Sequence, residues 1–85
     1  MESAPDLCVE IVSPKDRWTQ IAKKVEQYLA IGVKLIWVID PKTRRAHVYR
    51  AEKTVSMYGA EDTLSGESVL PGFELSLKKL FAVLA

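Results

Sequence analysis

The chain has 85 residues, 48% of them apolar and 27% charged, with four glycines, four prolines and one cysteine. This length and composition predict one small globular domain over residues 1–85, and they exclude disordered and collagen-like proteins. The formal net charge of +1 gives no overall signature of a nucleic-acid-binding protein. No apolar run reaches the ~18 residues of a membrane span, there is no secretory signal, and one cysteine cannot form an internal disulfide, so we expect a cytoplasmic protein.

The charges are unevenly distributed along the chain. Residues 15–53 contain ten basic and four acidic residues, a local net charge of +6, and the rest of the chain contains two basic and seven acidic residues, a net charge of −5. Such a cluster is typical of a solvated helix face and hairpin. It also fits a basic surface beside an acidic one, as expected at a site that binds both phosphate and a metal.

Residues 5–12 predict a β-strand, because they are rich in β-branched residues and lie between two prolines. The period of two places Leu7, Val9 and Ile11 on one apolar face of this strand. The other face carries Asp6, Cys8, Glu10 and Val12.

A long helix is predicted after this strand. Ser13 has the character of a helix cap, Pro14 suits the first helical position, and Asp16 follows three residues after the cap. Helical spacing continues through Ile31, and Gly32 is a suitable residue for the end of the helix. The apolar residues with this spacing are Trp18, Ile21, Ala22, Val25, Tyr28 and Leu29.

Residues 33–39 are almost all apolar and predict a central strand that is covered on both faces. Residues 40–43 have the pattern of a turn, and residues 45–50 return as an antiparallel strand. Residues 54–58 have the pattern of a further strand.

The last part of the chain is interpreted as a polar loop over residues 61–67, a short segment interrupted by Pro71 and Gly72, and a final helix capped by Ser76. The predicted order is strand, helix, strand, strand, strand, helix. The first three elements predict a parallel crossover, and the following hairpin makes the sheet mixed. The fold class is therefore α/β, with one long helix packed on a mixed sheet.

Several chemistries are excluded by what the sequence lacks. It has no glycine-rich phosphate loop after a strand and no nucleophile elbow, and one histidine and one cysteine cannot build the usual zinc site. We interpret His47 as an exposed or half-buried strand residue and Cys8 as a small buried hydrophobic residue. Trp18 and Trp37 are assigned to the core.

Glu10 is the main candidate for chemistry. It lies between Val9 and Ile11, where a buried carboxylate without a partner costs several kcal/mol. Either it lies at a sheet edge and faces water, or it points to a lysine from the following helix or to a hard cation such as Mg²⁺. Asp6 shares its face, but four residues of strand separate the two by about 13 Å, too far for both to bind one ion directly.

Five segments occur in the order and spacing of a known family, and together they span nearly the whole chain. They are Pro5–Pro14, Lys24–Val33, Ile36–Pro41, Val48–Arg50 and Leu70–Phe73. On these segments the sequence resembles the Uma-type restriction endonucleases, which belong to the PD-(D/E)XK nuclease superfamily. The resemblance implies a restriction-endonuclease-like fold. It also implies a truncated one, the C-terminal half only, because members of this family are about twice as long.

The resemblance also implies residue roles. Glu10 matches the second acid of the family's metal site, and Lys24 matches its lysine, which lies on the helix because the usual acid-x-lysine position is occupied by Val12. The first acid has no match in this chain, and Asp6 matches a family position without a defined role. The implied cofactor is Mg²⁺ or Mn²⁺ and the implied substrate is DNA. Glu10 would bind the metal, and Lys24 would position the attacking water and offset phosphate charge.

Three functions remain open from the sequence. The first is a Mg²⁺-dependent DNA endonuclease that receives its first acid from a partner subunit or from a longer gene product. The second is a non-catalytic remnant of the nuclease fold, in which an open sheet edge and an exposed face of the 33–39 strand favour a homo-oligomer. The third is a small nucleic-acid-binding module that uses the basic residues Lys23, Lys24, Arg44, Arg45 and Arg50.

Overall fold

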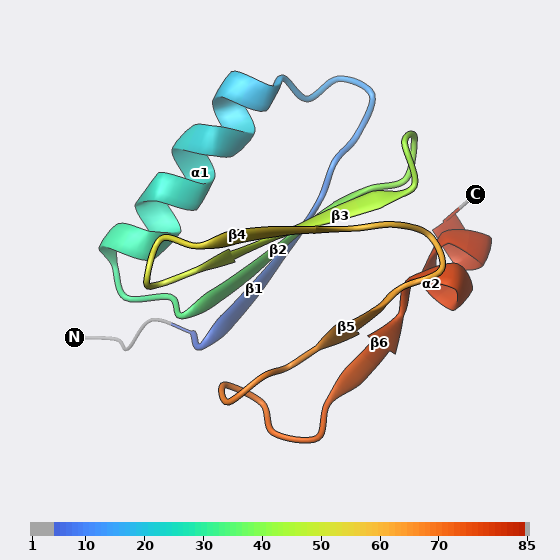
Figure 1. Ribbon diagram of the computed structural model, residues 1–85. Coiled ribbons are helices and arrows are strands. Elements are labelled where there is room, and N and C mark those ends of the chain that lie inside the picture. Colours follow the sequence, from blue (N-terminus) through green and yellow to red (C-terminus); the bar gives the residue numbers. More distant parts are fainter. Residues whose placement is uncertain (1–4, 85) are drawn as a thin grey trace.

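The computed structural model describes residues 5–84, in which one sheet separates two layers (Figure 1). The four-stranded sheet has the order β1-β2-β3-β4, with helix α1 on one face and a β5-β6 hairpin with helix α2 on the other. The elements are β1 (Leu7–Ile11), α1 (Trp18–Ala30), β2 (Leu35–Asp40), β3 (Arg45–Arg50), β4 (Val55–Tyr58), β5 (Thr63–Ser65), β6 (Glu74–Ser76) and α2 (Leu77–Leu84).

The strand directions confirm the predicted mixed sheet. β1 and β2 pair in parallel, whereas β2 with β3 and β3 with β4 pair antiparallel. The α/β fold class, with its long helix packed on the sheet, is therefore confirmed. Within residues 5–84, neither helix has the length and apolar character that crossing a membrane requires.

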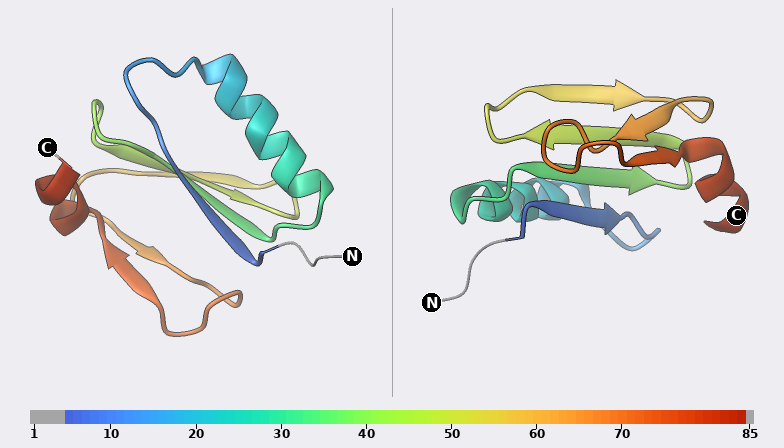
Figure 2. Two further views of the ribbon diagram at one scale, coloured as in Figure 1. Left: turned by 180° about the vertical axis from the view of Figure 1, so that it is seen from behind. Right: turned by 90° about the horizontal axis from the view of Figure 1, so that it is seen from below.

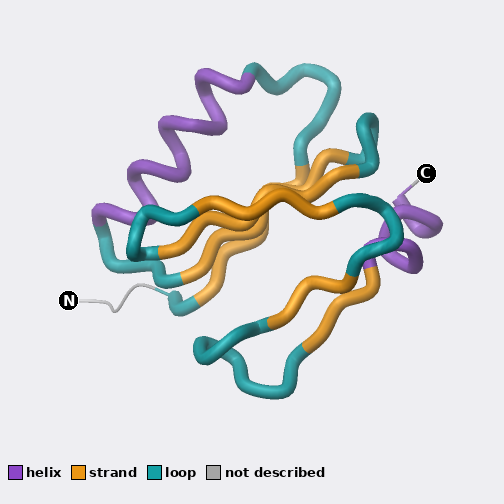
Figure 3. Tube along the Cα trace, viewed as in Figure 1, coloured by secondary structure: helices purple, strands orange, loops and turns teal. Residues whose placement is uncertain are grey.

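The start of α1 differs from the sequence prediction. Residues 12–17 form a loop (Figure 3), in which the Asp16 amide donates to the Ser13 carbonyl at 3.0 Å and the Ser13 amide donates to the Asp16 carboxylate at 2.8 Å. These local bonds compete with helix formation. The N-cap residue is Arg17, with φ −106° and ψ 141°. The predicted end of the helix is confirmed, since Gly32 follows it with φ +99°.

The central strand β2 is buried on both faces, as predicted. Its six residues, Leu35–Asp40, are all buried. On the α1 face the buried residues are Ile21, Val25, Val33, Ile36 and Val38. On the hairpin face they are Leu35, Trp37, Ile39, Ala46, Val48, Leu64, Leu77 and Phe81. The expectation that one face of the 33–39 strand is exposed is therefore wrong, because the hairpin and α2 cover it.

The hairpin was not predicted from the sequence. The segment interpreted as a polar loop contains β5, and Leu64 at its centre is only 1% exposed. The turn between β5 and β6 depends on Gly66, whose amide donates to the Phe73 carbonyl at 2.7 Å. A Cβ atom at this position would overlap the carbonyl oxygen of Leu70, so the backbone contact requires glycine.

The two tryptophans have different environments. Trp37 is buried, as predicted, and its ring stacks on Phe73 with centroids 5.9 Å apart. The assignment of Trp18 to the core is wrong: it is 46% exposed at the first position of α1, where its ring lies 5.1 Å from that of His47. His47 itself is half-buried, as expected, and the predicted cap of α2 is confirmed by a 3.3 Å bond from the Lys79 amide to the Ser76 hydroxyl.

β1 is left at an edge of the sheet. In the right-hand view of Figure 2, the hairpin lies over the middle of the sheet, α2 lies beyond the ends of the strands, and β1 is the outermost strand on one side. Two of its apolar side chains are correspondingly open to solvent, with Val9 49% and Ile11 46% exposed.

Candidate functional site

The structure brings Glu10 and Lys24 together, although they lie on different elements. Glu10 is on β1, on the face that α1 covers. The Nζ atom of Lys24 lies 3.7 Å from Glu10 Oε2, and the Tyr28 hydroxyl donates a hydrogen bond of 2.7 Å to Glu10 Oε1. Lys24 and Tyr28 are four residues apart on α1, so they lie on the same helix face. We call Glu10, Lys24 and Tyr28 the β1–α1 cluster.

The β1–α1 cluster is partly open to solvent. The Glu10 side chain is 22% exposed and that of Lys24 is 50% exposed. Glu10 thus lies neither in the core nor free in water. An ion pair as exposed as this one contributes only about 0–1 kcal/mol to stability, so the fold does not depend on it.

Glu10 changes the acidity of its neighbours. The hydrogen bond to Glu10, followed by burial and the negative charge of Glu10, raises the pKa of Tyr28 to about 12. Tyr28 therefore keeps its proton at neutral pH and holds the carboxylate in place. Burial and then the charge of Glu10 raise the pKa of the Cys8 thiol, which disfavours the thiolate that a nucleophilic cysteine needs.

Asp6, the acidic residue just before β1, has a simpler environment. Its Oδ1 atom lies 3.7 Å from Lys34 Nζ, and both side chains are 63% exposed. The distance equals that between Lys24 and Glu10, but this second pair is much more exposed. The Asp6–Lys34 pair is therefore a natural control for the β1–α1 cluster.

The β1–α1 cluster offers a metal ion one carboxylate, that of Glu10. Mg²⁺ binds proteins through one or two carboxylates and keeps several waters, so Glu10 is a suitable ligand of the correct chemical type. No group of three or more His, Cys, Asp or Glu side chains suited to a metal occurs within residues 5–84. The donor set thus fits a hard divalent cation in part, and a complete site requires a further carboxylate.

Arg50 has a structural role. Its Nε atom donates to both carboxylate oxygens of Glu67 at 2.9 Å, and its Nη1 atom donates to the Ser56 hydroxyl at 2.9 Å. This arrangement joins β3 to the hairpin and raises the pKa of Arg50. Arg50 is therefore already committed, which removes one of the five residues assigned to a nucleic-acid-binding surface.

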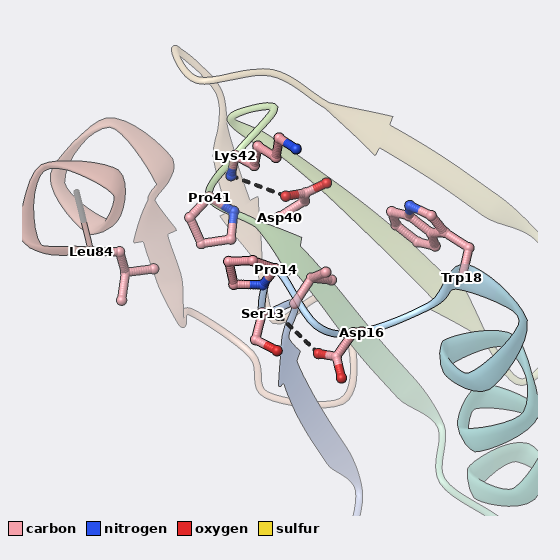
Figure 4. Close-up of a pocket in the computed structure, with 9 residues that line it drawn as sticks. Ser13, Pro14, Asp16, Trp18, Asp40, Pro41, Lys42 and Leu84 are labelled. Atoms are coloured by element: carbon pink, nitrogen blue, oxygen red, sulfur yellow. Dashed lines mark hydrogen bonds between the residues drawn. The ribbon is translucent and has the colours of Figure 1, made fainter.

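A pocket of about 550 Å³ lies next to the carboxyl ends of β1 and β2 (Figure 4). Its two carboxylates hold turns: Asp16 accepts from the Ser13 amide at 2.8 Å and Asp40 accepts from the Lys42 amide at 3.0 Å. Glu10 does not line this pocket, so the pocket and the β1–α1 cluster are separate. The lining residues are Val12, Ser13, Pro14, Asp16, Trp18, Asp40, Pro41, Lys42 and Leu84.

Comparison with known structures identifies the class of fold. A solved structure described as "a putative nuclease belonging to DUF820 from Anabaena variabilis" matches this chain with a TM-score of 0.85 and 29% sequence identity. The match covers 99% of this chain and 48% of that chain. This chain thus spans about half the length of the structure it matches, and its fold is that of a nuclease-like α/β protein.

Comparison with protein families identifies the particular family. Residues 1–78 match the Uma2 family, described as "Putative restriction endonuclease". The chain belongs to this family, so the resemblance deduced from the five sequence segments is confirmed. A search of curated proteins gave no match.

Tyr28 is the residue of the cluster that sequence reasoning missed. It was assigned to the apolar stripe of the helix, whereas its hydroxyl is the closest partner of Glu10. The signal was its spacing of four residues from Lys24, which places both polar ends on the same side of α1. The roles of Glu10 and Lys24 in catalysis stay predictions.

Proposed function

We propose that the β1–α1 cluster is one part of a divalent-metal-dependent centre that hydrolyses phosphodiester bonds in DNA. The observation that carries this proposal is the 3.7 Å approach of Lys24 to Glu10, across two elements, in a chain of a restriction-endonuclease family. A carboxylate with a lysine beside it and access to solvent is suited to act on a phosphate. A cytoplasmic location, where the DNA substrate is accessible, is part of the proposal.

Each residue of the cluster has a distinct part in this proposal. Glu10 would hold Mg²⁺ or Mn²⁺, which when bound polarises a phosphate and lowers the pKa of water. Lys24 carries a positive charge that offsets the charge developing on the phosphate and positions the attacking water. Tyr28, with its pKa raised to about 12, donates a hydrogen bond that orients the Glu10 carboxylate and leaves Oε2 directed towards Lys24.

The β1–α1 cluster contains one carboxylate, that of Glu10. We propose that the further carboxylate of the metal site comes from residues outside the cluster. Either a second copy of the chain or a longer gene product would supply it. The 48% coverage of the solved relative supports this view, since that protein has about as much chain again in which to hold such a residue.

Plasmid cleavage in the presence of Mg²⁺ or Mn²⁺ tests the proposal. We expect the wild-type protein to cut DNA, and Glu10→Gln and Lys24→Met to lower the rate by at least about 100-fold, because each removes a group that stabilises developing charge. Lys34→Met is the matched control: it removes an equally distant lysine–carboxylate contact, to Asp6 just before β1, and should keep the wild-type rate.

Other outcomes would point to the alternative functions. Absence of cleavage by the wild type, or equal cleavage by Glu10→Gln, would overturn the nuclease proposal. DNA binding that weakens steeply with salt and ignores Mg²⁺ would instead favour a nucleic-acid-binding module. A protein that neither binds nor cuts DNA would favour a non-catalytic remnant of the fold.

A further inference from the structure

The pocket in Figure 4 combines apolar walls with a few polar groups. Its sides come from the loop before α1 and from the turn after β2, and its volume is about 550 Å³. Ligand pockets in proteins are typically about 300–1,000 Å³, with mostly apolar walls and a small number of fixed polar groups. Val12, Pro14 and Pro41 are apolar walls here, and the Trp18 ring adds an aromatic one. This size and lining suit a flat ligand with an apolar face.

Asp40 is the deeply buried polar group of this pocket. It is only 6% exposed, and its Oδ1 atom accepts from the Lys42 amide at 3.0 Å. Within residues 5–84, no second hydrogen bond and no ion pair involves this carboxylate, and its Oδ2 atom is open to the pocket. Figure 4 shows Oδ2 directed away from the turn, on the side of the pocket where Trp18 lies. Because burial of a charged group without a partner is costly, Oδ2 is an acceptor that a ligand would satisfy.

An acceptor beside an aromatic ring selects the chemistry of the ligand. The acceptor requires an N–H donor, and the ring favours a flat partner that stacks on it. Cytosine, adenine and guanine combine a flat ring with an exocyclic amino group, and protein carboxylates accept from the amino group of cytosine. Thymine presents its O4 acceptor where cytosine presents the amino group, so a carboxylate repels it there. Lys42, which also lines the pocket, carries a positive charge that suits the phosphate of a nucleotide.

The pocket lies close to the β1–α1 cluster along the chain direction of β1. Val12 lines the pocket and packs on the α1 face, which is the face that carries Glu10. Two residues of extended chain separate Glu10 from Val12, which is about 7 Å. One nucleotide is long enough to cross this distance. The base of a nucleotide whose phosphate lies at the β1–α1 cluster would therefore reach the pocket.

We propose that this pocket binds an unpaired nucleobase that carries an exocyclic amino group. Asp40 Oδ2 accepts from the amino group, and the Trp18 ring stacks on the base. Because a base inside a duplex is stacked and uses its amino group for pairing, the bound base belongs to a single strand or leaves the duplex. The link between this base and DNA cleavage rests on the proposed function, whereas base binding itself does not.

Quenching of Trp18 fluorescence tests the stacking. In EDTA, where metal-dependent cleavage is prevented, oligodeoxycytidylate should quench the wild-type emission and bind at least about 10-fold more tightly than oligothymidylate of equal length. The two strands carry the same backbone charge, so nonspecific phosphate contacts cancel in the comparison. Trp18→Phe retains Trp37 and should show no quenching. Quenching that persists in Trp18→Phe, or equal affinity of the wild type for the two strands, would overturn the base pocket.

Asp40→Asn tests the hydrogen bond while it preserves the turn. The amide oxygen of asparagine still accepts from the Lys42 amide, whereas its amino group replaces the free acceptor by a donor that suits thymine O4. The preference for oligodeoxycytidylate should therefore disappear or reverse. Asp16→Asn is the matched control: Asp16 is the other carboxylate of the pocket, it accepts from the Ser13 amide, and its variant should keep the preference. A preference that survives in Asp40→Asn would overturn the role of Asp40, and circular dichroism would verify that both variants fold.

The same measurements separate this inference from the proposed function. A preference for oligodeoxycytidylate in a protein that does not cut DNA would overturn the nuclease proposal and support the base pocket. Cleavage of DNA by a protein without this preference would do the reverse. A cationic side chain of a partner protein is the other ligand that suits a buried carboxylate. Stronger quenching by N-acetylarginine amide than by deoxycytidine monophosphate would favour that ligand and overturn the base pocket.

Discussion

The two faces of the sheet are built for different tasks. The hairpin face carries eight buried apolar residues and is sealed by β5, β6 and α2. The α1 face carries five, and at its β1 edge it holds the partly exposed β1–α1 cluster. Because side chains alternate along each strand, neighbours in sequence serve opposite faces: Glu10 faces α1, whereas Val9 and Ile11 face the other way. One face thus stabilises the fold, while the other combines a smaller core with polar groups.

The largest expected loss of stability follows from removing a core side chain on the hairpin face of the sheet. Phe81 is 2% exposed on α2 and packs in the core beneath the hairpin. Phe81→Ala should lower the free energy of unfolding by about 3–5 kcal/mol, since it removes a buried ring and leaves a cavity. Denaturation with urea would measure this loss. Val83→Ala is the control on the same helix: Val83 is 81% exposed, so a comparable loss there would contradict this account of the core.

A smaller effect should follow from separating the hairpin from the sheet. Arg50 and Glu67 join the two, with Nη2 2.7 Å from the carboxylate and side chains only 16% and 32% exposed. Glu67→Gln should cost about 1–3 kcal/mol, because it leaves a partly buried guanidinium without its charged acceptor. Glu61→Gln is the matched control, since Glu61 and Lys78 are 4.0 Å apart and more than 70% exposed. Equal midpoints in urea for the two variants would show that the Arg50 contact does not hold the hairpin.

The smallest effect concerns the α1 face. The pKa of Tyr28 is raised to about 12 from its usual 10.0, so the folded chain binds this proton more tightly than the unfolded chain. Its contribution to stability is complete below about pH 10 and is lost as the pH rises from about 10 towards 12. Ultraviolet absorbance would follow the titration. In Glu10→Gln the late tyrosine transition should move down towards its usual value, and an unchanged titration curve would exclude Glu10 as the cause.

The parts of the fold that were predictable have strong local patterns. The buried run of β2, the β3 strand and the end of α1 at Gly32 follow from apolar periodicity and from glycine at a left-handed position. The hairpin was missed because β5 and β6 have three residues each, and only Leu64 shows deep burial in β5. Such strands form because the sheet beneath them offers an apolar surface, which no local pattern reveals.

The candidate site was predictable only in part. Glu10 stood out as a carboxylate in an apolar strand, and the family resemblance selected Lys24. The sequence prediction placed the start of α1 too early. The pattern of Ser13 to Asp16 suits both a helix cap and a turn, and the hydrogen bond from the Ser13 amide to the Asp16 carboxylate stabilises the turn. The partnership of Tyr28 with Glu10 depends on how α1 crosses β1, which is a property of tertiary packing.

The placement of the two tryptophans allows unfolding of the two layers to be followed by intrinsic fluorescence. Trp18 is exposed at the start of α1, and Trp37 is buried beneath the hairpin, so the two indoles emit from wet and dry surroundings on opposite faces of the sheet. Each layer therefore carries one fluorescent residue. Trp18→Phe leaves Trp37 as the remaining tryptophan, and Trp37→Phe leaves Trp18. If the layers separate together, both reporters change at one denaturant concentration. If the hairpin opens first, the blue-shifted emission of Trp37 moves to longer wavelength while Trp18 still reports an intact α1.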